Sequence, residues 1–336
     1  GNLLFIKYNE VQRTERMGAN MELELKKECL DTYELGEPQT LTQEETAETI
    51  VPDYCPDIAR IISAEGVVCL HGGTEQDGVT GTVRVTVLYT PENESGVRAL
   101  EFAMPFSAQG EGLAGCAHVV VETEIELLES RMLNPRKIFT RCKLVTHLAG
   151  CRKVCLTISS DAETDPALLV EKRCCGQTVS LLRQVAEKDL TFSETMSLSL
   201  GREGAAELLH CRANGIVTET KAIGNKLIFK GVFLVSALYR TIGGQLASAS
   251  AELPFSQIME TDSTEENTQV SMRLRITGTD IQIDGSDDEG RQLSVTVYYH
   301  TMAFLRETRE VTLLTDLYST AYETRYEPSQ LDLCSL

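Results

Sequence analysis

Apolar and polar residues alternate with a period of two along much of this chain. Between Thr82 and Tyr89, three valines at every second position alternate with Thr, Arg and Thr. The same alternation recurs in three further segments: 119–127, 272–276 and 292–299. This pattern is typical of antiparallel strands with one face in a core and the other in water. We therefore expect an all-β fold of antiparallel β-sandwiches or open barrels.

Turn sequences separate the alternating segments, and few short helices are expected among them. Gly243-Gly244 is a clear hairpin signal between two such segments. Residues 57–63 follow Pro56 and are expected to form a short helical turn, because proline suits the first helical position. Residues 205–211 are expected to do the same, and 171–185 fits either helix or strand.

The alternating segments return after about 150 residues. Three segments recur in the same order: Ala64–Val68 as Ala213–Val217, Gly81–Tyr89 as Gly231–Tyr239, and Pro105–Ser107 as Pro254–Ser256. This interval is far longer than a solenoid repeat, so each copy should bury its own core. The pattern predicts that Tyr89 and Tyr239 occupy equivalent places, as do Phe106 and Phe255.

The repeat predicts two tandem β domains. We expect the first at 21–160 and the second, with a C-terminal tail, at 161–336, joined by a polar linker at 159–166. Residues 1–20 are unlike anything in the second copy and are expected to be a disordered or cloning-derived extension, with Met21 as the biological start.

The net charge and the cysteine content limit which partners and which cellular compartment we expect for this protein. The formal net charge of −19 argues against a nucleic-acid-binding or anionic-membrane surface. The 11 cysteines have no regular spacing, which favours reduced thiols in a cytoplasmic protein over a disulfide framework. The chain has no apolar run long enough to predict membrane insertion.

No residue pattern predicts catalysis, a cofactor or a metal. His147, Cys151 and Cys155 are zinc-ligand types, but on a strand they would spread over about 26 Å. The adjacent Cys174 and Cys175 are expected to be buried thiols. Phosphate-binding, dinucleotide-binding and nucleophile motifs are absent from the sequence. A hydrolase with an acidic cleft and a saccharide- or peptidoglycan-binding module remain alternatives, although the lack of tryptophan counts against the second.

Two copy-specific segments are candidates for partner binding. The segment 51–57 carries two prolines, two aspartates and a tyrosine, and the segment 130–137 ends in a basic turn. The candidate partner-binding residues are Pro52, Asp53, Tyr54, Pro56, Asp57, Arg131, Arg136 and Lys137. Tyrosine and arginine are enriched at interfaces, and prolines lower the entropy lost on binding. The alternative is that both segments are internal braces, with Arg136 paired to a nearby carboxylate.

Several of these segments resemble the SPOCS domain of spore-coat morphogenetic proteins in endospore-forming clostridia. The first copy carries the resemblance at Ile50–Asp53, Pro56–Ile58, Gly81–Tyr89, Pro105–Ser107 and Leu133–Arg136, and the second at Gly231–Tyr239, Pro254–Gln257 and Thr315–Thr320.

The resemblance implies a non-enzymatic scaffold in the cytoplasm of the mother cell, at the forespore surface. Its implied partner is a spore-coat protein, with a coat-basement ATPase as the candidate, and the resemblance implies no oligomeric state. Family members of this kind carry a C-terminal LysM domain tied to partner engagement, which this sequence lacks. The second copy also lacks the Val-Pro-Asp segment, so any function of that segment is expected in the first copy.

Overall fold

The computed structural model describes residues 4–16, 19–21, 23–71, 78–198, 203–262, 264, 267–284, 290–321 and 324–333. The strands are β1 (Leu4–Arg16), β2 (Ala19–Met21), β3 (Glu24–Leu35), β4 (Gln39–Ile50), β5 (Ile58–His71), β6 (Gly78–Pro91), β7 (Arg98–Gln109), β8 (His118–Asn134), β9 (Lys137–Glu163), β10 (Val170–Ser197), β11 (Ala205–Ile223), β12 (Lys226–Thr241), β13 (Leu246–Glu260), β14 (Gln269–Ile283), β15 (Gln292–Ser319) and β16 (Thr324–Leu333). Neighbouring strands pair antiparallel, which confirms the all-β prediction.

The one helical element in the described part of the chain is a 3-10 turn at Pro166–Leu168. The short helices expected at 57–63 and 205–211 are wrong, because β5 and β11 begin there and pair with β6 and β12. Residues 171–185 lie in β10. Pairing with an adjacent alternating strand outweighs the weak local helix signal.

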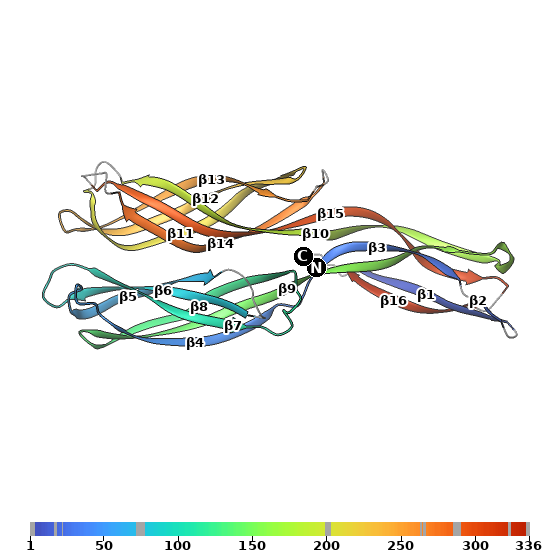
Figure 1. Cartoon of the computed structure of the whole chain (residues 1–336), viewed down its shortest axis with the longest axis horizontal. Helices are drawn as coiled ribbons and strands as arrows, with labels where there is room; N and C mark the ends of the chain where they lie inside the picture. The colour runs from blue at the N-terminus through green and yellow to red at the C-terminus, as the bar shows by residue number, and fades with distance from the viewer. Residues whose placement is uncertain are drawn as a thin grey trace.

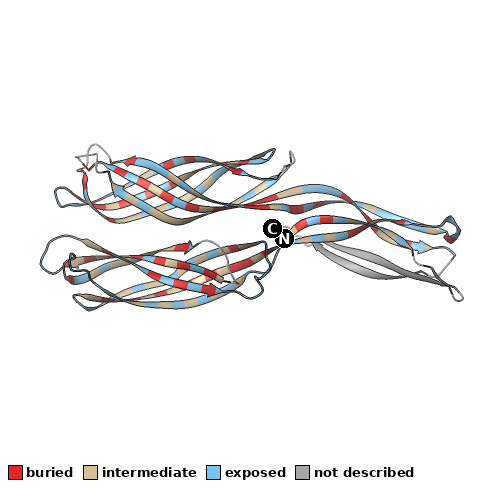
Figure 2. Cartoon of the chain, viewed as in Figure 1, coloured by how far each residue is buried: buried red, intermediate tan, exposed pale blue. Residues whose placement is uncertain are grey.

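Two sandwiches, here called the heads, lie side by side at one end of the molecule (Figure 1). In the first head, sheet β5-β6-β7 packs against β4, β8 and the first half of β9. In the second head, sheet β11-β12-β13 packs against β14 and the adjoining halves of β10 and β15. Neither sheet pair closes into a barrel in the described residues. Figure 2 shows buried residues alternating with exposed ones along these strands, as the period-two pattern predicts.

Three strands run on beyond the heads into a stem (Figure 1). The stem consists of β3 with residues 151–163 of β9, and residues 170–182 of β10 with 306–319 of β15. Its small core contains Leu30, Ile158, Val179, Leu181, Val311 and Leu313. The predicted linker is therefore wrong at 159–163, which is strand. A further sheet, β16-β1-β2, places residues 4–16 and 19–21 in strands, where the sequence suggested a disordered or cloning-derived extension.

The two heads use the same strand register around their most similar segments. Gly81 pairs with Phe106, and Gly231 pairs with Phe255. A Cβ atom on either glycine would come within 2.7 Å or 2.5 Å of the paired phenylalanine ring, so each ring lies over its glycine. Tyr89 and Tyr239 are both fully buried on the corresponding strands. The predicted equivalence of both pairs is confirmed.

The remaining repeated segment, Ala64–Val68, pairs two residues away from the position that its sequence match to Ala213–Val217 predicts. Gly66 pairs with Val85, whereas Gly215 pairs with Phe233, the counterpart of Val83. The sequence match of Ala64–Val68 to Ala213–Val217 is therefore two residues out of structural register. An even displacement keeps the same side chains facing the core, so alternation alone could not reveal it.

Two expectations about cysteines are corrected. Cys29 and Cys155 are joined by a disulfide between β3 and β9, so the expectation of reduced thiols is wrong for this pair. Cys174 is exposed and Cys175 half-buried, not fully buried as expected, while Cys69, Cys142 and Cys151 are buried free thiols. No helix in the described part of the chain has the length and apolar character needed to cross a membrane.

Candidate functional site

The segment 51–57, here called the Tyr54 loop, joins β4 to β5 at the end of the first head farthest from the stem. The main chain ties it at both ends to the turn between β8 and β9. Val51 N donates to Arg136 O at 2.9 Å, and Ile58 N donates to Pro135 O at 2.9 Å. Inside the loop, Cys55 N donates to Pro52 O at 2.9 Å. The loop is thus held as a compact turn.

The side chain of Arg136 holds the loop from within. Its Nη1 donates to Cys55 O at 2.8 Å and to Asp57 Oδ1 at 3.0 Å. Its Nη2 donates to Val51 O at 2.9 Å and to Asp53 Oδ1 at 3.1 Å. Four acceptors on one planar guanidinium fit the forked donor geometry that only arginine offers. Arg136 is therefore an internal brace, which is the alternative that the sequence left open.

Tyr89 supports the loop from the core. Its hydroxyl donates to Pro56 O at 3.2 Å, and its side chain is fully buried. Burial, with a smaller effect of the neighbouring Cys55 thiol, raises the pKa of Tyr89 to about 12. Tyr89 therefore remains a neutral hydrogen-bond donor at physiological pH.

The loop turns an apolar surface outward. Tyr54 is 87% exposed, and Ile50, at the loop's first boundary, is 71% exposed. Met132 and Leu133, on the β8 side of the bracing turn, are also exposed. Large apolar side chains held in this way are characteristic of interaction sites.

Arg131 and Lys137 lie next to the loop, on a different surface. The Arg131 guanidinium lies 4.8 Å from the centre of the Phe139 ring. Lys137 Nζ is 2.5 Å from Glu48 Oε2. Among the described contacts, neither side chain makes a polar interaction with the loop. The structure therefore brings Pro52, Asp53, Tyr54, Pro56, Asp57 and Arg136 together, and leaves Arg131 and Lys137 on the outer face of the β4-β9-β8 sheet.

The second head makes the same two main-chain attachments on either side of its corresponding connection. Leu198 N donates to Arg291 O at 2.7 Å, and Ala205 N donates to Gly290 O at 2.7 Å. Arg291 thus occupies the place of Arg136, and the connection 198–204 has the same length as 51–57. Sequence reasoning missed Arg291. The signal was an arginine directly before each of the last long strands, β9 and β15.

The Tyr54 loop stands at the edge of a hollow of about 590 Å³ between the heads. Tyr54 and Cys55 line it from the first head, and residues 207–211 and 279–281 line it from the second. Arg84 Nη1 crosses the gap and donates to Thr279 O at 2.9 Å. The loop therefore lies close to both heads.

A second polar contact between the heads centres on Glu187 of β10. His118 Nδ1, from the first head, is 2.5 Å from Glu187 Oε1, and His300 Nε2 is 3.5 Å from Glu187 Oε2. Burial would raise the pKa of Glu187, but the hydrogen bonds from His300 and His118 outweigh it and lower that pKa. The pKa of His300 is raised, first by Glu187 and also by Asp189, against burial and the nearby Arg275.

The three residues of zinc-ligand type lie apart along one strand, as the sequence predicts. His147, Cys151 and Cys155 are all on β9. His147 Nδ1 is 3.0 Å from Thr40 Oγ1. Cys151 is buried in a hydrophobic cluster with Val120 and Ala149, and Cys155 forms the disulfide with Cys29. These three side chains do not converge on one ion.

Comparison with known proteins identifies one part of the chain. Residues 205–284 match the family model described as SipL, SPOCS domain. The matched residues contain β11, β12, β13 and β14, which form most of the second head. No curated protein and no solved structure matches the chain. Residues 205–284 are therefore similar to the SPOCS domain, and this match covers 80 of the chain's 336 residues.

Proposed function

We propose that this chain is a non-enzymatic scaffold of spore-coat or spore-envelope assembly, and that it binds a protein partner through the Tyr54 loop. The match of residues 205–284 to the SPOCS domain supports the connection with sporulation. The observation that carries the binding site is the combination of four hydrogen bonds from Arg136 with a Tyr54 side chain that is 87% exposed.

The loop is suited to binding because its conformation is fixed beforehand. Ordering a flexible side chain at an interface costs about 0.5–1.5 kcal/mol, and a loop that is already ordered avoids much of that cost. Pro52 and Pro56 restrict the backbone, and Arg136 holds the remaining carbonyl and carboxylate groups. Arg136 thus holds Tyr54 in position for the partner and does not itself contact the partner in this proposal.

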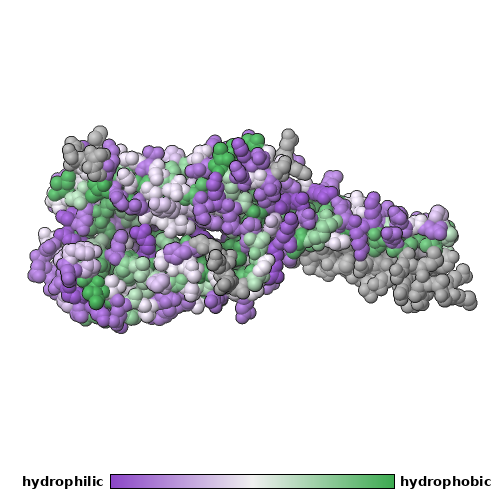
Figure 3. Space-filling model, in the orientation of Figure 1, coloured by the Kyte–Doolittle hydropathy of each residue, from purple (hydrophilic) through white to green (hydrophobic). Residues whose placement is uncertain are grey.

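Each candidate residue has a role in this proposal. Tyr54 contacts the partner, with Ile50, Met132 and Leu133 extending the apolar surface. Pro52, Asp53, Pro56, Asp57 and Arg136 hold the loop, and Arg131 and Lys137 flank it. Figure 3 shows one face of the molecule, which is mostly hydrophilic with separate apolar patches. The net charge of −19 favours a partner whose contact surface has a basic rim.

The family resemblance adds the expected setting. It supports action in the mother-cell cytoplasm at the forespore surface, with a coat-basement ATPase as the first partner to test. The hollow between the heads gives the hydrolase alternative no support, because each carboxylate that lines it already has a side-chain partner: Glu207 lies 2.6 Å from Arg240, Asp280 accepts from Gln282, and Glu101 accepts from Thr86. The saccharide alternative would need stacked aromatic platforms, and Tyr54 is the one aromatic residue of the loop.

The test is direct binding of the purified coat-basement ATPase to the full chain by biolayer interferometry. Tyr54→Ala should weaken binding about 30-fold, as for an interface hot spot worth about 2 kcal/mol. Tyr318→Ala is the matched control, since Tyr318 is 52% exposed on the stem. Its binding and melting temperature should equal those of the wild type.

The variant Arg136→Lys distinguishes the role of Arg136 in holding the loop from the role of Tyr54 in contacting the partner. Lysine keeps the charge but cannot reproduce four directed hydrogen bonds. We expect weaker binding together with faster hydrogen exchange in residues 51–57. If Tyr54→Ala binds as tightly as the Tyr318→Ala control, the loop is not the binding site.

A further inference from the structure

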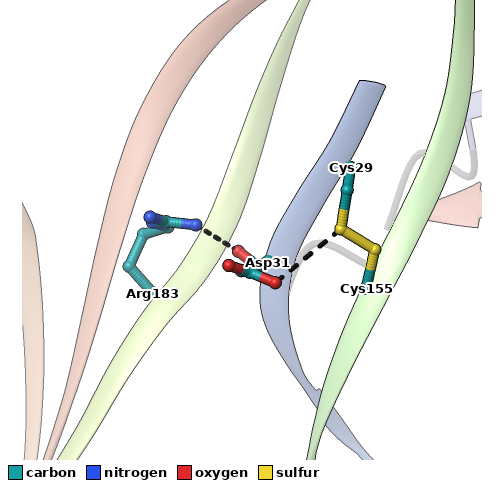
Figure 4. Close-up of a disulfide and its surroundings, with 4 residues drawn as sticks. All are labelled: Cys29, Asp31, Cys155 and Arg183. Atoms are coloured by element: carbon teal, nitrogen blue, oxygen red, sulfur yellow. Dashed lines mark hydrogen bonds between the residues drawn. A yellow bond between two sulfur atoms is a disulfide. The ribbon is translucent and has the colours of Figure 1, made fainter. Parts of the chain in front are cut away.

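One cluster on the stem is not explained by a scaffold role. Cys29 and Asp31 lie on β3, and Cys155 lies on the paired strand β9 (Figure 4). In the ladder, Asp31 is directly opposite Cys155, and Cys29 is diagonal to it. The three side chains therefore share the outer face of the stem, where all three are exposed.

The donor atoms of these residues lie together. The two sulfur atoms and a carboxylate oxygen are all within 4.8 Å of one another, and Asp31 Oδ1 is 3.8 Å from Cys29 Sγ. The disulfide holds the two cysteine Cα atoms 5.7 Å apart. Two backbones at this spacing can direct both sulfur atoms at one point without moving a strand.

The Asp31 carboxylate is available to a ligand. Among the described contacts, no cationic side chain pairs with it. Arg183 donates instead to the main-chain oxygen of Asp31 (Figure 4), while its Nε is 3.4 Å from Glu307 Oε2. Arg183 thus fixes the position of β3 against β10, and neither carboxylate oxygen of Asp31 has a cationic partner among the described residues.

Two thiolates and a carboxylate are ligands that Zn²⁺ prefers. Zinc binds sulfur at about 2.3 Å and carboxylate oxygen at about 2.0–2.2 Å, so ligand atoms on one tetrahedral ion lie roughly 3.4–3.8 Å apart. The present separations reach these values once the sulfur–sulfur bond is broken and the side chains rotate. Three protein ligands leave a fourth position for water or for a donor from another molecule.

We propose that Cys29, Asp31 and Cys155 form a redox-gated site for a thiophilic divalent cation of the Zn²⁺ class. The disulfide form excludes the metal, because its sulfur atoms are bonded to each other. A dithiol reductant supplies two electrons and two protons, is itself oxidised to a disulfide, and leaves two thiols on the protein. Metal binding then releases both thiol protons. The stem stays cross-linked between β3 and β9 in both forms, first by a covalent bond and then by the ion.

The test uses the purified full chain, reduced with dithiothreitol and desalted under nitrogen. Zn²⁺ is titrated in competition with a chromophoric chelator, and Co²⁺ is titrated while the thiolate-to-cobalt charge-transfer absorption is recorded. The reduced chain should bind one ion with this absorption. The oxidised chain, with its Cys29–Cys155 bond verified by peptide mass spectrometry, should bind none.

Variants assign the site. Cys29→Ser and Cys155→Ser should each abolish the charge-transfer signal, and Asp31→Asn should weaken affinity at least tenfold, the scale seen when groups that support metal sites are removed. Cys174→Ser, which removes an exposed thiol elsewhere on the stem, is the control and should bind as the wild type. Circular dichroism verifies that each variant is folded.

The proposal is overturned if the reduced wild type takes up no more Zn²⁺ than the Cys29→Ser/Cys155→Ser double variant. It is also overturned if the oxidised chain binds the ion as tightly as the reduced chain. Equal affinity of Asp31→Asn and the wild type would remove Asp31 from the site and contradict the three-ligand assignment.

Discussion

The two heads have the same strand register around their most similar segments and the same main-chain attachments, and they differ in the side chains of their cores and connections. Both place a phenylalanine over a glycine and tie a seven-residue connection to the turn before the last long strand. In the first head, that connection is a loop with two prolines that Arg136 holds by hydrogen bonds, and the core is largely aliphatic. The second head has a core with a cluster of aromatic rings. The main-chain attachments have thus been kept while the side chains diverged.

The largest expected effect concerns the two cores. Phe255 lies 4.6 Å from Phe233 and 5.9 Å from Tyr299, ring centre to ring centre, and Phe106 has no such ring contact among the described residues. Removing a buried phenylalanine costs about 3–5 kcal/mol, and an aromatic pair adds about 0.5–1.5 kcal/mol. Phe255→Ala should therefore lower the free energy of unfolding more than Phe106→Ala.

Urea unfolding followed by circular dichroism measures that difference, and hydrogen exchange locates it. Each variant should lose protection in its own head first. Equal destabilisation by the two variants would show that the aromatic cluster adds nothing to the second head.

A smaller effect separates the two buried tyrosines. The Tyr89 hydroxyl donates to Pro56 O, but the buried Tyr239 hydroxyl has no hydrogen-bond partner among the described residues. Tyr89→Phe should lower the free energy of unfolding by about 1 kcal/mol, because it leaves the Pro56 carbonyl unpaired. Tyr239→Phe should be neutral or slightly stabilising, because it removes a buried hydroxyl that has no hydrogen-bond partner among the described residues. A loss for Tyr239→Phe as large as that for Tyr89→Phe would contradict this difference, and thermal melts of both variants measure it.

The smallest expected effect tests the contact between the heads. The raised pKa of His300 means that its stabilising contribution is fully present below the unfolded value of about 6.5 and is lost as pH rises through the folded value. The lowered pKa of Glu187 adds stability above about 4.5 that is lost at lower pH. Stability should therefore fall by less than about 1 kcal/mol between pH 6 and pH 8.

Melting temperatures across this pH range provide the measurement, with Glu187→Gln as the matched variant. Glu187→Gln should flatten the profile, because it removes the carboxylate that interacts with both His118 and His300. An unchanged profile in that variant would assign the pH dependence to other groups.

The strands and the repeat could be predicted because alternation and turns are local patterns. Tyr89 and Tyr239 were placed correctly for that reason. The stem could not be predicted, because nothing in β9 or β15 marks where a strand leaves one sandwich and enters another region. The two-residue displacement of Gly66 against Gly215 was hidden by the same alternation that revealed the strands.

The candidate site was predictable only in part. The proline, aspartate and tyrosine residues of 51–57 are visible in the sequence as unusual side chains, and an internal role for Arg136 is one of the two alternatives that the sequence allows. Two of its four acceptors are the main-chain oxygens of Val51 and Cys55, which leave no mark in a sequence. The Cys29–Cys155 bond joins residues 126 positions apart, so only the fold could pair them.

The long strands also determine how the molecule carries mechanical load. β9, β10 and β15 pass from a head into the stem without a break in the main chain, and a strand of this length reaches about 90 Å when extended. A pull along the long axis therefore loads many ladder hydrogen bonds in shear at once, instead of opening them one after another. Such a molecule is expected to behave as a stiff spacer that keeps its two ends at a set distance.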